Sequence, residues 1–353
     1  MAVDPRDAAS TELSTDSLAE IAHEEQLAHG AVPHAQGPWR IAGRRLRRNK
    51  VALAFLALFF VVVAVCLAAP IWANDVAKRG PKDNNEVGTV TVDGKKKDVV
   101  SPDGVPIGPT YQGSYFLGAD ANGRDTAVRL LYGGRNSLLI GLTAALITAS
   151  FSVLLGIVSG YFGGFADSVI SRSMDVLWAF PVILLGVALG TALGVAGLKI
   201  GPITLAADSK LIPILIIGFV YVPYLARPIR GQVLALRQKE FVEAAESQGA
   251  GSVRIMFSEI LPNLTSTIIV FLPLAVANAI LLEAALSFVG AGVRSPETSW
   301  GTMIAEGVET ITSAPHQTIV PGIMLVLTVL GLNVFGDGVR DAFDPRAKIR
   351  VEH

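Results

Sequence analysis

The chain has little of the side-chain chemistry from which catalytic and metal sites are built. Its only cysteine, Cys66, lies inside an apolar run, and we interpret it as a small packing residue that carries no information on disulfides. The five histidines fall in the tails or in an outer loop, without the paired spacing of metal ligands: His23, His29, His34, His316 and His353. No nucleophile is paired with a base in the apolar runs. We therefore expect no metal site and no catalytic residues.

A phosphate-binding loop is also missing. No Gly-x-x-x-x-Gly-Lys-Ser/Thr segment occurs, so the chain itself does not bind ATP in the P-loop manner. The net charge is −1 at pH 7, and a basic cluster at 40–50 is better explained by membrane topology than by nucleic acid. The sequence therefore predicts neither an enzyme nor a partner nucleic acid, and it indicates no cofactor.

Charged residues are scarce, which points to a membrane protein. They make up 17% of the chain, against roughly 25% in soluble domains, and the mean hydropathy is +0.50. Six continuous apolar runs approach or exceed the length that crosses about 30 Å of hydrocarbon: 51–73, about 137–161, 176–197, 211–226, 264–289 and 319–335. Continuous runs predict helices rather than a barrel. The expected fold is all-α, a polytopic membrane protein with six transmembrane helices.

Basic residues near the ends of the runs predict the orientation. Six of them immediately precede the first run: Arg40, Arg44, Arg45, Arg47, Arg48 and Lys50. The loop between the fourth and fifth runs is basic as well, and so is the C-terminal tail, through Arg340, Arg346, Lys348 and Arg350. The short outer loops hold few such residues. We therefore expect both termini in the cytosol and the first run as an uncleaved anchor.

Composition divides the chain into five segments. Residues 1–37 are polar and acidic and are expected to form a disordered cytosolic tail. Residues 38–73 hold a basic juxtamembrane segment and the first transmembrane helix, and 74–136 form an extracytoplasmic segment. A core of five helices follows over 137–336, with a cytosolic C-terminal tail at 337–353.

The extracytoplasmic segment carries the signals of a small hairpin. Residues 89–92 and 98–100 favour strands, and Asp93-Gly94 favours a tight turn, which the lysines at 95–97 are expected to extend. We interpret this insertion as surface decoration. A contact with a substrate-delivering protein is the alternative.

The loop 227–263 between the fourth and fifth runs is rich in charged helix formers and predicts a knob at the cytosolic face. Residues 237–248 favour a helix, which Gly249 can end in the left-handed conformation. Ser252 can cap a second helix, and Pro262 is expected to stop that helix and redirect the chain into the next span.

One face of the first knob helix can pack while the other faces water. Phe241 and Ala245 lie one turn apart, with Val242 nearby, whereas Glu243 and Glu246 point elsewhere. A rigid knob of this kind can pass motion from a soluble partner into membrane helices. An ordinary helix-turn-helix between two spans is the alternative.

Residues of the knob resemble a known motif. Glu243-Ala244-Ala245, then Gly249, then Ile260-Leu261-Pro262 resemble the EAA loop of ABC import permeases, which docks on an ATP-hydrolysing subunit. Other segments are similar to oligopeptide, dipeptide and nickel import permeases: Leu117-Gly118-Ala119-Asp120, Gly123-Arg124-Asp125, Asp175 to Pro181, Ser299-Trp300-Gly301 and Gly336 to Arg346. Their co-linear order, over roughly 38–70 and 115–347, identifies the chain as a C-type member of these paired permeases.

The resemblance implies the ABC type I importer permease fold with cytosolic EAA-type coupling helices, in a bacterial cytoplasmic membrane. It implies a paralogous permease as heterodimer partner in the lipid bilayer, two cytosolic ATP-binding subunits that hydrolyse ATP, and an extracytoplasmic solute-binding protein. The cargo it favours is a di- or oligopeptide, with nickel or another small solute as alternatives. A membrane anchor that recruits a soluble cytosolic partner is the competing class of function.

Charged groups in or beside the spans are candidates for a gate or a translocation pathway. Glu283 can line a path or bond neighbouring helices, and we favour the structural bond. Arg124 and Asp125 are expected to form a charged pair that either seals an outer gate or pins the loop, and we favour pinning. Gly186, Gly190 and Gly194 recur at one-turn spacing and predict close approach of another helix, from this chain or from a second subunit.

Overall fold

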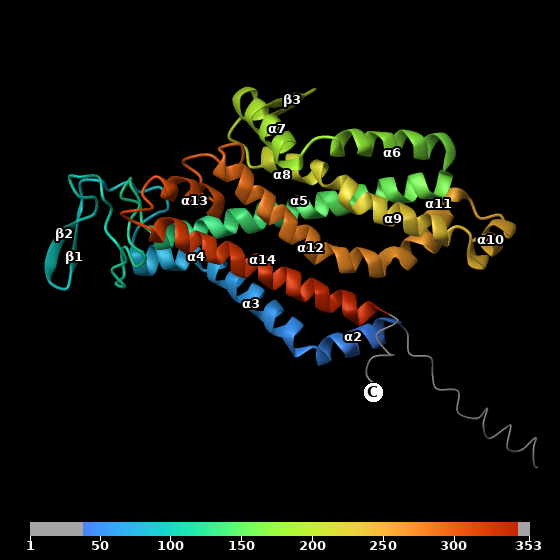
Figure 1. Cartoon of the computed structure of the whole chain (residues 1–353), viewed down its shortest axis with the longest axis horizontal. Coiled ribbons are helices and arrows are strands. Elements are labelled where there is room, and N and C mark those ends of the chain that lie inside the picture. The colour runs from blue at the N-terminus through green and yellow to red at the C-terminus, as the bar shows by residue number, and fades with distance from the viewer. Residues whose placement is uncertain (1–37, 345–353) are drawn as a thin grey trace, which may run out of the picture.

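Long helices run side by side along the longest axis of the molecule (Figure 1). They are seen in a computed structural model that describes residues 38–344. The tail predicted to be disordered at 1–37 and the last residues of the C-terminal tail, 345–353, lie outside the described residues. Within the described part the regular structure is helical apart from two short hairpins, which confirms the predicted all-α class.

Five helical segments between residues 38 and 344 are long and apolar enough to cross a membrane. The first is α3 (Lys50–Leu67), the second α5 (Thr126–Phe162), and the last α14 (His316–Phe343). The third segment joins α8 (Leu211–Val220) to α9 (Val222–Leu236). The fourth joins α11 (Ser252–Arg254), the π-helix η2 (Ile255–Ile260) and α12 (Leu261–Phe288). The protein is therefore a multi-pass membrane protein.

The third predicted span, 176–197, is not one continuous helix. The structure has α6 (Gly164–Trp178) and α7 (Val182–Ala196), bent by 84° where the chain passes Pro181. Proline has no N–H to donate and disfavours helical conformation in the residue before it, which accounts for the break. A sixth span exists only if this bent pair crosses as one unit.

The second span begins earlier than hydropathy predicts, because a side chain caps it. Asp125 accepts hydrogen bonds from the backbone N–H groups of Ala127 and Val128, at 2.9 and 3.1 Å, so α5 starts at Thr126 rather than near 137. Such a cap satisfies donors that the first helical turn leaves free. At the other end of the chain α14 continues to Phe343, so the segment predicted as a tail from 337 is helical over its first residues.

Helix α5 packs closely against α8 and α9 through small and hydroxyl side chains. Thr148 and Ser152 donate to the carbonyls of Gly218 and Val222, each at 2.9 Å. One turn further on, a Cβ atom added at Gly156 would lie only 2.7 Å from a methyl carbon of Ile229. Small residues that let backbones approach in this way are typical of helix packing in membranes.

The glycine stripe of α7 meets residues of this same chain. Gly186, Gly190 and Gly194 are buried, and they lie against Leu286, the Ala291 carbonyl and the Arg294 guanidinium. The sequence did not decide whether these glycines pack against this chain or against a second subunit. In the structure they pack against the end of α12 and the loop after it.

One end of the molecule, which we call the hairpin end, gathers the segments between α3 and α5. It contains α4 (Ala69–Ile71), the π-helix η1 (Trp72–Ala77) and the hairpin of β1 (Thr89–Val92) with β2 (Lys95–Asp98). Asp93 and Gly94 both have positive φ, +52° and +75°, as a tight two-residue turn requires. The predicted hairpin is thus present, but the lysines lie in β2 instead of extending the turn.

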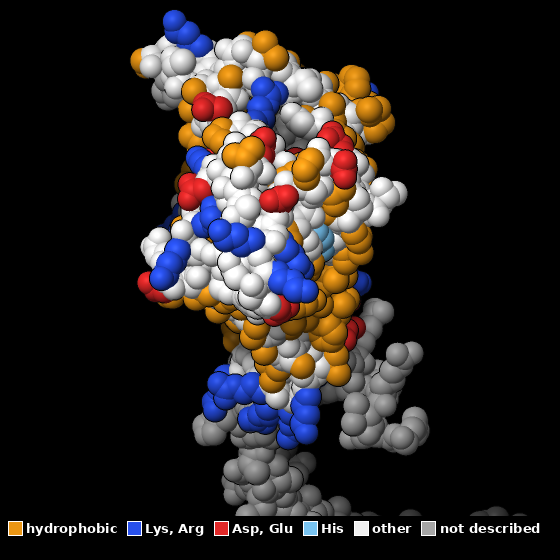
Figure 2. All heavy atoms as spheres, turned by 90° about the vertical axis from the view of Figure 1, so that its left-hand side faces the viewer, with side chains coloured by type: hydrophobic (Ala, Val, Ile, Leu, Met, Phe, Trp, Pro, Cys, Tyr) orange, Lys and Arg blue, Asp and Glu red, His pale blue; other side chains and the backbone are white. Residues whose placement is uncertain are grey.

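Figure 2 views this hairpin end face on. Charged side chains of both signs lie on this face, and hydrophobic side chains cover the sides of the molecule next to it. Helix α13 (Trp300–Val308) also lies here. A second hairpin that the sequence did not predict, β3 (Leu198–Ile200) with β4 (Ile203–Leu205), lies apart from this end, beside α7 (Figure 1).

The opposite end, which we call the coupling end, holds α2 (Pro38–Arg48) and α10 (Glu240–Ser247) (Figure 1). Helix α2 is fastened to the end of α14. Arg45 donates to the Asp344 carbonyl at 2.7 Å, and the Trp39 ring meets the Phe343 ring edge-on with centroids 5.3 Å apart. The basic helix and the last turn of α14 therefore form one packed unit.

Candidate functional site

Helix α10 projects from the coupling end as a knob between α9 and α11 (Figure 1). Its end is closed by two reverse hydrogen bonds, from Gly249 N–H to the Glu246 carbonyl at 2.9 Å and from Ala250 N–H to the Ala245 carbonyl at 3.0 Å. This pairing requires a left-handed residue after the helix, and Gly249 has φ at +80°. The predicted helix stop at Gly249 is confirmed.

One face of α10 packs onto the membrane helices. Val242 is 1% exposed and joins a buried apolar cluster with Val233 of α9, Ile255 of η2 and Leu264 of α12. Ala245 is partly buried against the same cluster. Because α10 shares one core with α9 and α12, the knob and these two helices are packed as one body.

The opposite face of α10 is open. Glu243 and Ala244 are exposed, and so is Phe241, which the sequence had placed on the packed face. The difference arises because Val242, not Phe241, points into the cluster. The exposed face therefore combines carboxylates, an alanine and an aromatic ring, a surface on which another protein can dock.

A hydrogen bond fastens the base of the knob to α5. Arg237, just after α9, donates to the Tyr161 carbonyl in the last turn of α5 at 2.9 Å. Cations stabilise the carbonyl end of a helix, where backbone acceptors have no helical partner. Sequence reasoning missed this contact, because the basic residues of the loop were used only to predict orientation.

The second knob helix differs from the prediction at both of its ends. Gly251, not Ser252, occupies the N-cap position, and no side chain caps it. Pro262 neither stops the helix nor redirects the chain, because α11, η2 and α12 run on as a single 37-residue span. Pro262 lies in the first turn of α12, directly after the π-helix. A π-turn widens the backbone, which gives room for a ring that would otherwise collide with the preceding turn.

The residues of the EAA-like motif fall into two sets. Glu243, Ala244 and Gly249 are exposed on the knob. Ile260, at the end of η2 within the following span, is fully buried, with Leu261 partly buried and Pro262 exposed. The buried apolar cluster that contains Val242 and Ile260 joins these two sets. The motif therefore connects an exposed docking face to a membrane helix.

A second group of charged residues lies at the hairpin end, and all of its members except the partly exposed Glu306 are buried. Arg124 bonds Asp120 at 2.7 Å and Glu306 of α13 at 2.8 Å. Arg129 bonds Asp120 as well, and Glu306 at 2.7 Å. Two arginines and two carboxylates thus tie the start of α5 to α13. The sequence offered no signal that Glu306 would complete this cluster.

The predicted pair of Arg124 with Asp125 does not form. Asp125 instead accepts the N–H of Tyr115 at 2.5 Å and caps α5. Burial raises the pKa of the Asp125 carboxyl, and the backbone N–H bonds from Tyr115, Val128 and Ala127 act in the opposite direction.

Glu283 lies deep in α12 with no exposed surface. Ser287 donates to its carboxylate at 2.7 Å, and the same hydroxyl accepts the N–H of Val293 at 2.9 Å. These bonds connect α12 to the loop that follows it through one carboxylate oxygen, Oε1. The other oxygen, Oε2, is buried without a hydrogen-bond partner among the described residues. A role in a gate or pathway stays a prediction for Glu283, Arg124 and Asp125.

Comparison with protein families gives two matches along the chain. Residues 152–349 match the family described as binding-protein-dependent transport system inner membrane component. Residues 37–86 match the N-terminal TM domain of oligopeptide transport permease C. The first match includes the α10 knob, and the second covers α2, α3 and η1.

Similar proteins match nearly the whole chain. The dipeptide transport system permease protein DppC of Alkalihalophilus pseudofirmus is 35% identical over 89% of this chain and 92% of its own length. The glutathione transport system permease protein GsiD of Pectobacterium atrosepticum is 35% identical, covering 88% and 92%. The oligopeptide transport system permease protein OppC of Haemophilus influenzae is 33% identical, covering 87% and 88%. An inward-facing structure of the MetNI methionine ABC transporter aligns with 61% of this chain and 96% of that chain, at 17% identity and a TM-score of 0.48.

Proposed function

This chain belongs to the family of binding-protein-dependent transport system inner membrane components, and we propose that it forms one half of a pathway that imports peptides. Three similar permeases are named for dipeptide, glutathione and oligopeptide transport. Their names support di- or oligopeptides as the cargo, delivered by an extracytoplasmic binding protein.

The observation that carries this proposal is the α10 knob. It presents an exposed face with Glu243 and Ala244, while Val242 on its other face is packed into the core of α9 and α12. A push on the exposed face therefore moves both helices, because close-packed cores transmit displacement. The chain has no phosphate-binding loop, so the push comes from two partner subunits that bind and hydrolyse ATP.

The transport cycle that we propose alternates access to the pathway. Closure of the ATP-binding subunits pushes the knob and tilts α9 and α12 against a paralogous permease subunit. The cavity between the two permeases then changes from inward-open to outward-open, and the binding protein releases its cargo into it. The orientation that this requires places both termini and α10 in the cytosol and the hairpin outside, in agreement with the basic residues of α2.

The orientation is tested with single cysteines, because Cys66 is the only native one and is buried. In a Cys66→Ala background, a membrane-impermeant maleimide should label Lys96→Cys in intact cells. Ser247→Cys should react only after the membrane is permeabilised. Labelling of Ser247→Cys from outside would contradict the orientation.

The function is tested by reconstitution. The chain is copurified with a paralogous permease, the ATP-binding subunits and the binding protein, and uptake of labelled di- and oligopeptides into proteoliposomes is measured with and without ATP. We expect ATP-dependent peptide uptake. ATP-dependent uptake of nickel or another solute, with none of peptides, would reject the peptide cargo. Recruitment of a cytosolic partner without any uptake would favour the membrane anchor.

A further inference from the structure

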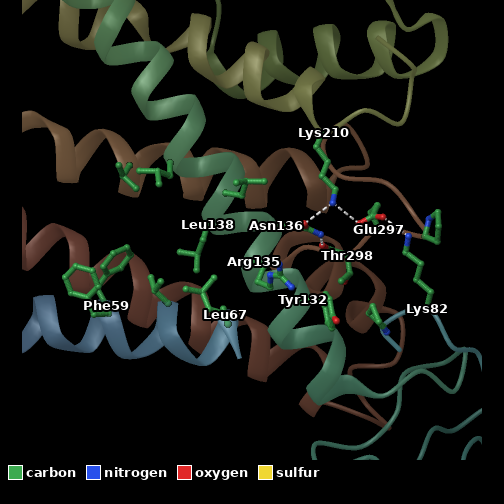
Figure 3. Close-up of a pocket in the computed structure, with 18 residues that line it drawn as sticks. Phe59, Leu67, Lys82, Tyr132, Arg135, Asn136, Leu138, Lys210, Glu297 and Thr298 are labelled. Atoms are coloured by element: carbon green, nitrogen blue, oxygen red, sulfur yellow. Dashed lines mark hydrogen bonds and ion pairs between the residues drawn. The ribbon is translucent and has the colours of Figure 1, made fainter. Parts of the chain in front are cut away.

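A cavity of about 770 Å³ lies between α3 and α5, towards the hairpin end (Figure 3). Its volume is in the range of sites that hold small organic molecules. Neither the knob nor the buried ion cluster of Asp120, Arg124, Arg129 and Glu306 contributes to its walls. The proposed transport cycle therefore leaves it without a role.

The walls of the cavity are apolar along the two helices. Phe60 and Leu67 of α3 and Leu139 and Leu142 of α5 line it, and each of these side chains is between 49% and 63% exposed. Both helices are long and apolar enough to cross a membrane, so the cavity opens onto the apolar surface of the spans. An acyl chain can fill such a space without leaving polar groups unpaired.

The end of the cavity that is nearest the hairpin end is polar and basic. Figure 3 shows Lys82, Lys210 and Glu297 meeting there: each lysine bonds the carboxylate, at 2.6 and 3.0 Å. Lys210 also donates to Asn136 at 3.0 Å. The two lysines and Glu297 come from three loops at the ends of the spans, where we expect the lipid headgroups.

Arg135, also in the lining, forms no ion pair with a carboxylate among residues 38–344. It is exposed on α5, and the centre of the Tyr132 ring lies 5.5 Å from its guanidinium carbon. Lys82, Lys210 and Arg135 stand against the one carboxylate of Glu297, so the charged lining residues sum to +2. A cation beside hydrocarbon is costly unless an anion or water reaches it.

We propose that this cavity binds an anionic phospholipid, with an acyl chain between α3 and α5 and the phosphate at Arg135 and the two lysines. The ligand has to combine a long apolar body, which matches the apolar walls of the cavity, with an anionic head, which matches its cationic residues. Charge-assisted bonds from a guanidinium to phosphate oxygens are strong and directional. A peptide backbone would fit poorly, because its N–H and C=O groups would find few partners along apolar walls.

If a lipid fills this site, the packing of α3 against α5 depends on that lipid. Helix α3 contributes one wall, and α5, the helix to which Arg237 fastens the knob, contributes the other. A bound lipid fills the space between them, so it should favour the packed arrangement by mass action. The inference does not depend on which cargo is transported.

The test measures lipid retention by the assembled transporter. The purified complex is titrated with phosphatidylglycerol or phosphatidylcholine of identical acyl chains, and bound lipid is counted by native mass spectrometry. We expect preferential retention of phosphatidylglycerol. Arg135→Gln should weaken that retention about fivefold, the effect of roughly one charge near a phosphate, and leave phosphatidylcholine unchanged. Arg135→Lys should retain most of the preference.

Two further variants separate the head site from the acyl site. Leu139→Trp fills the apolar part and should weaken retention of both lipids. Arg172→Gln removes an exposed arginine of α6 outside the cavity and should change neither. No preference for phosphatidylglycerol, or equal effects of Arg135→Gln and Arg172→Gln, would overturn the proposal. It would also be overturned if a photoreactive residue at position 142 crosslinked the partner permease instead of lipid.

Discussion

Gly249 ends α10 with φ at +80°, a conformation that costs a residue with a side chain about 1 to 2 kcal/mol. Space is not the constraint there, because a Cβ at this position would meet nothing within 4 Å. At the hairpin end the constraint is charge: Arg129 is 2% exposed and bonds two carboxylates. A single substitution can therefore act through backbone conformation at the coupling end and through buried charge at the hairpin end.

Gly249→Val should uncouple the transporter without preventing membrane insertion. A β-branched residue disfavours the left-handed conformation, so the two hydrogen bonds that close α10 weaken and the knob loses its fixed angle. We expect a loss of uptake and of stimulated ATPase activity of about tenfold, a 1.4 kcal/mol effect. Gly231→Val is the control, since Gly231 lies in α9 with negative φ and open space around it. Normal coupling in Gly249→Val would contradict the docking role.

Arg129→Met should destabilise the folded chain. Arg124 would then remain as the partner of both Asp120 and Glu306, so one negative charge of the cluster is left uncompensated. Breaking a fully buried ion pair costs about 3 to 5 kcal/mol, and because Glu306 is partly exposed we expect a loss at or below the lower end of that range. Thermal unfolding of the purified complex measures the effect. Glu309→Gln is the matched control, because Glu309 is exposed just after α13. If the two variants unfold at the same temperature, the cluster does not pin α5 to α13.

At the scale of elements, the packing of α5 on α9 carries the connection from core to knob. Thr148 and Ser152 bond carbonyls at the α8–α9 junction, and Gly156 lies one turn further along α5. A Cβ at Gly156 would be 2.7 Å from Ile229 and 3.0 Å from the Ala226 carbonyl. The backbone atom cannot move aside without displacing the helix, so the distance between α5 and α9 depends on this glycine.

Gly156→Val should therefore push α9 away from α5. Overpacking of this kind costs about 1 to 3 kcal/mol, and the displaced α9 carries the knob with it. We expect lower thermal stability together with reduced ATPase stimulation. Gly322→Val, in α14 with nothing within 4 Å of the added Cβ, should leave both unchanged. Wild-type behaviour of Gly156→Val would mean that the helices are not held together at this position.

At the scale of the whole molecule, ionic contacts at the hairpin end join segments far apart in the chain. Glu297, in the loop after α12, bonds two lysines. Lys82 lies between η1 and β1, and Lys210 lies just before α8. The hydrogen bond from Lys82, and then that from Lys210, hold the pKa of the Glu297 carboxyl below its usual value. The ionised form is therefore the one that stabilises the folded chain.

The sign of the pH dependence follows from that shift. Stabilisation by Glu297 is complete above about pH 4.3, the ordinary pKa of glutamate, and is lost as the pH falls through the lowered value. Thermal unfolding between about pH 6 and pH 3 should show a steeper loss in the wild type than in Glu297→Gln. Glu309→Gln serves as the control and should keep the wild-type slope. Parallel curves for wild type and Glu297→Gln would show that the contact contributes nothing.

Membrane class, helix class and the knob could be predicted from composition, hydropathy and local spacing, and comparison confirmed the family. These properties depend on the transfer energy of each side chain and on neighbours within one or two turns. The same reasoning located Gly249 and the turn at Asp93-Gly94, because glycine's backbone freedom is local.

Contacts between distant segments could not be predicted in this way. Arg124 pairs with Glu306, 182 positions away, and not with its neighbour Asp125. Pro181 bends one expected span, Pro262 leaves another intact, and the basic end of the α3–α5 cavity combines Lys82, Lys210 and Arg135. The sequence shows which residues can carry a charge or break a helix. Which of them meet depends on packing, since ionic and steric energies are set by distances in space.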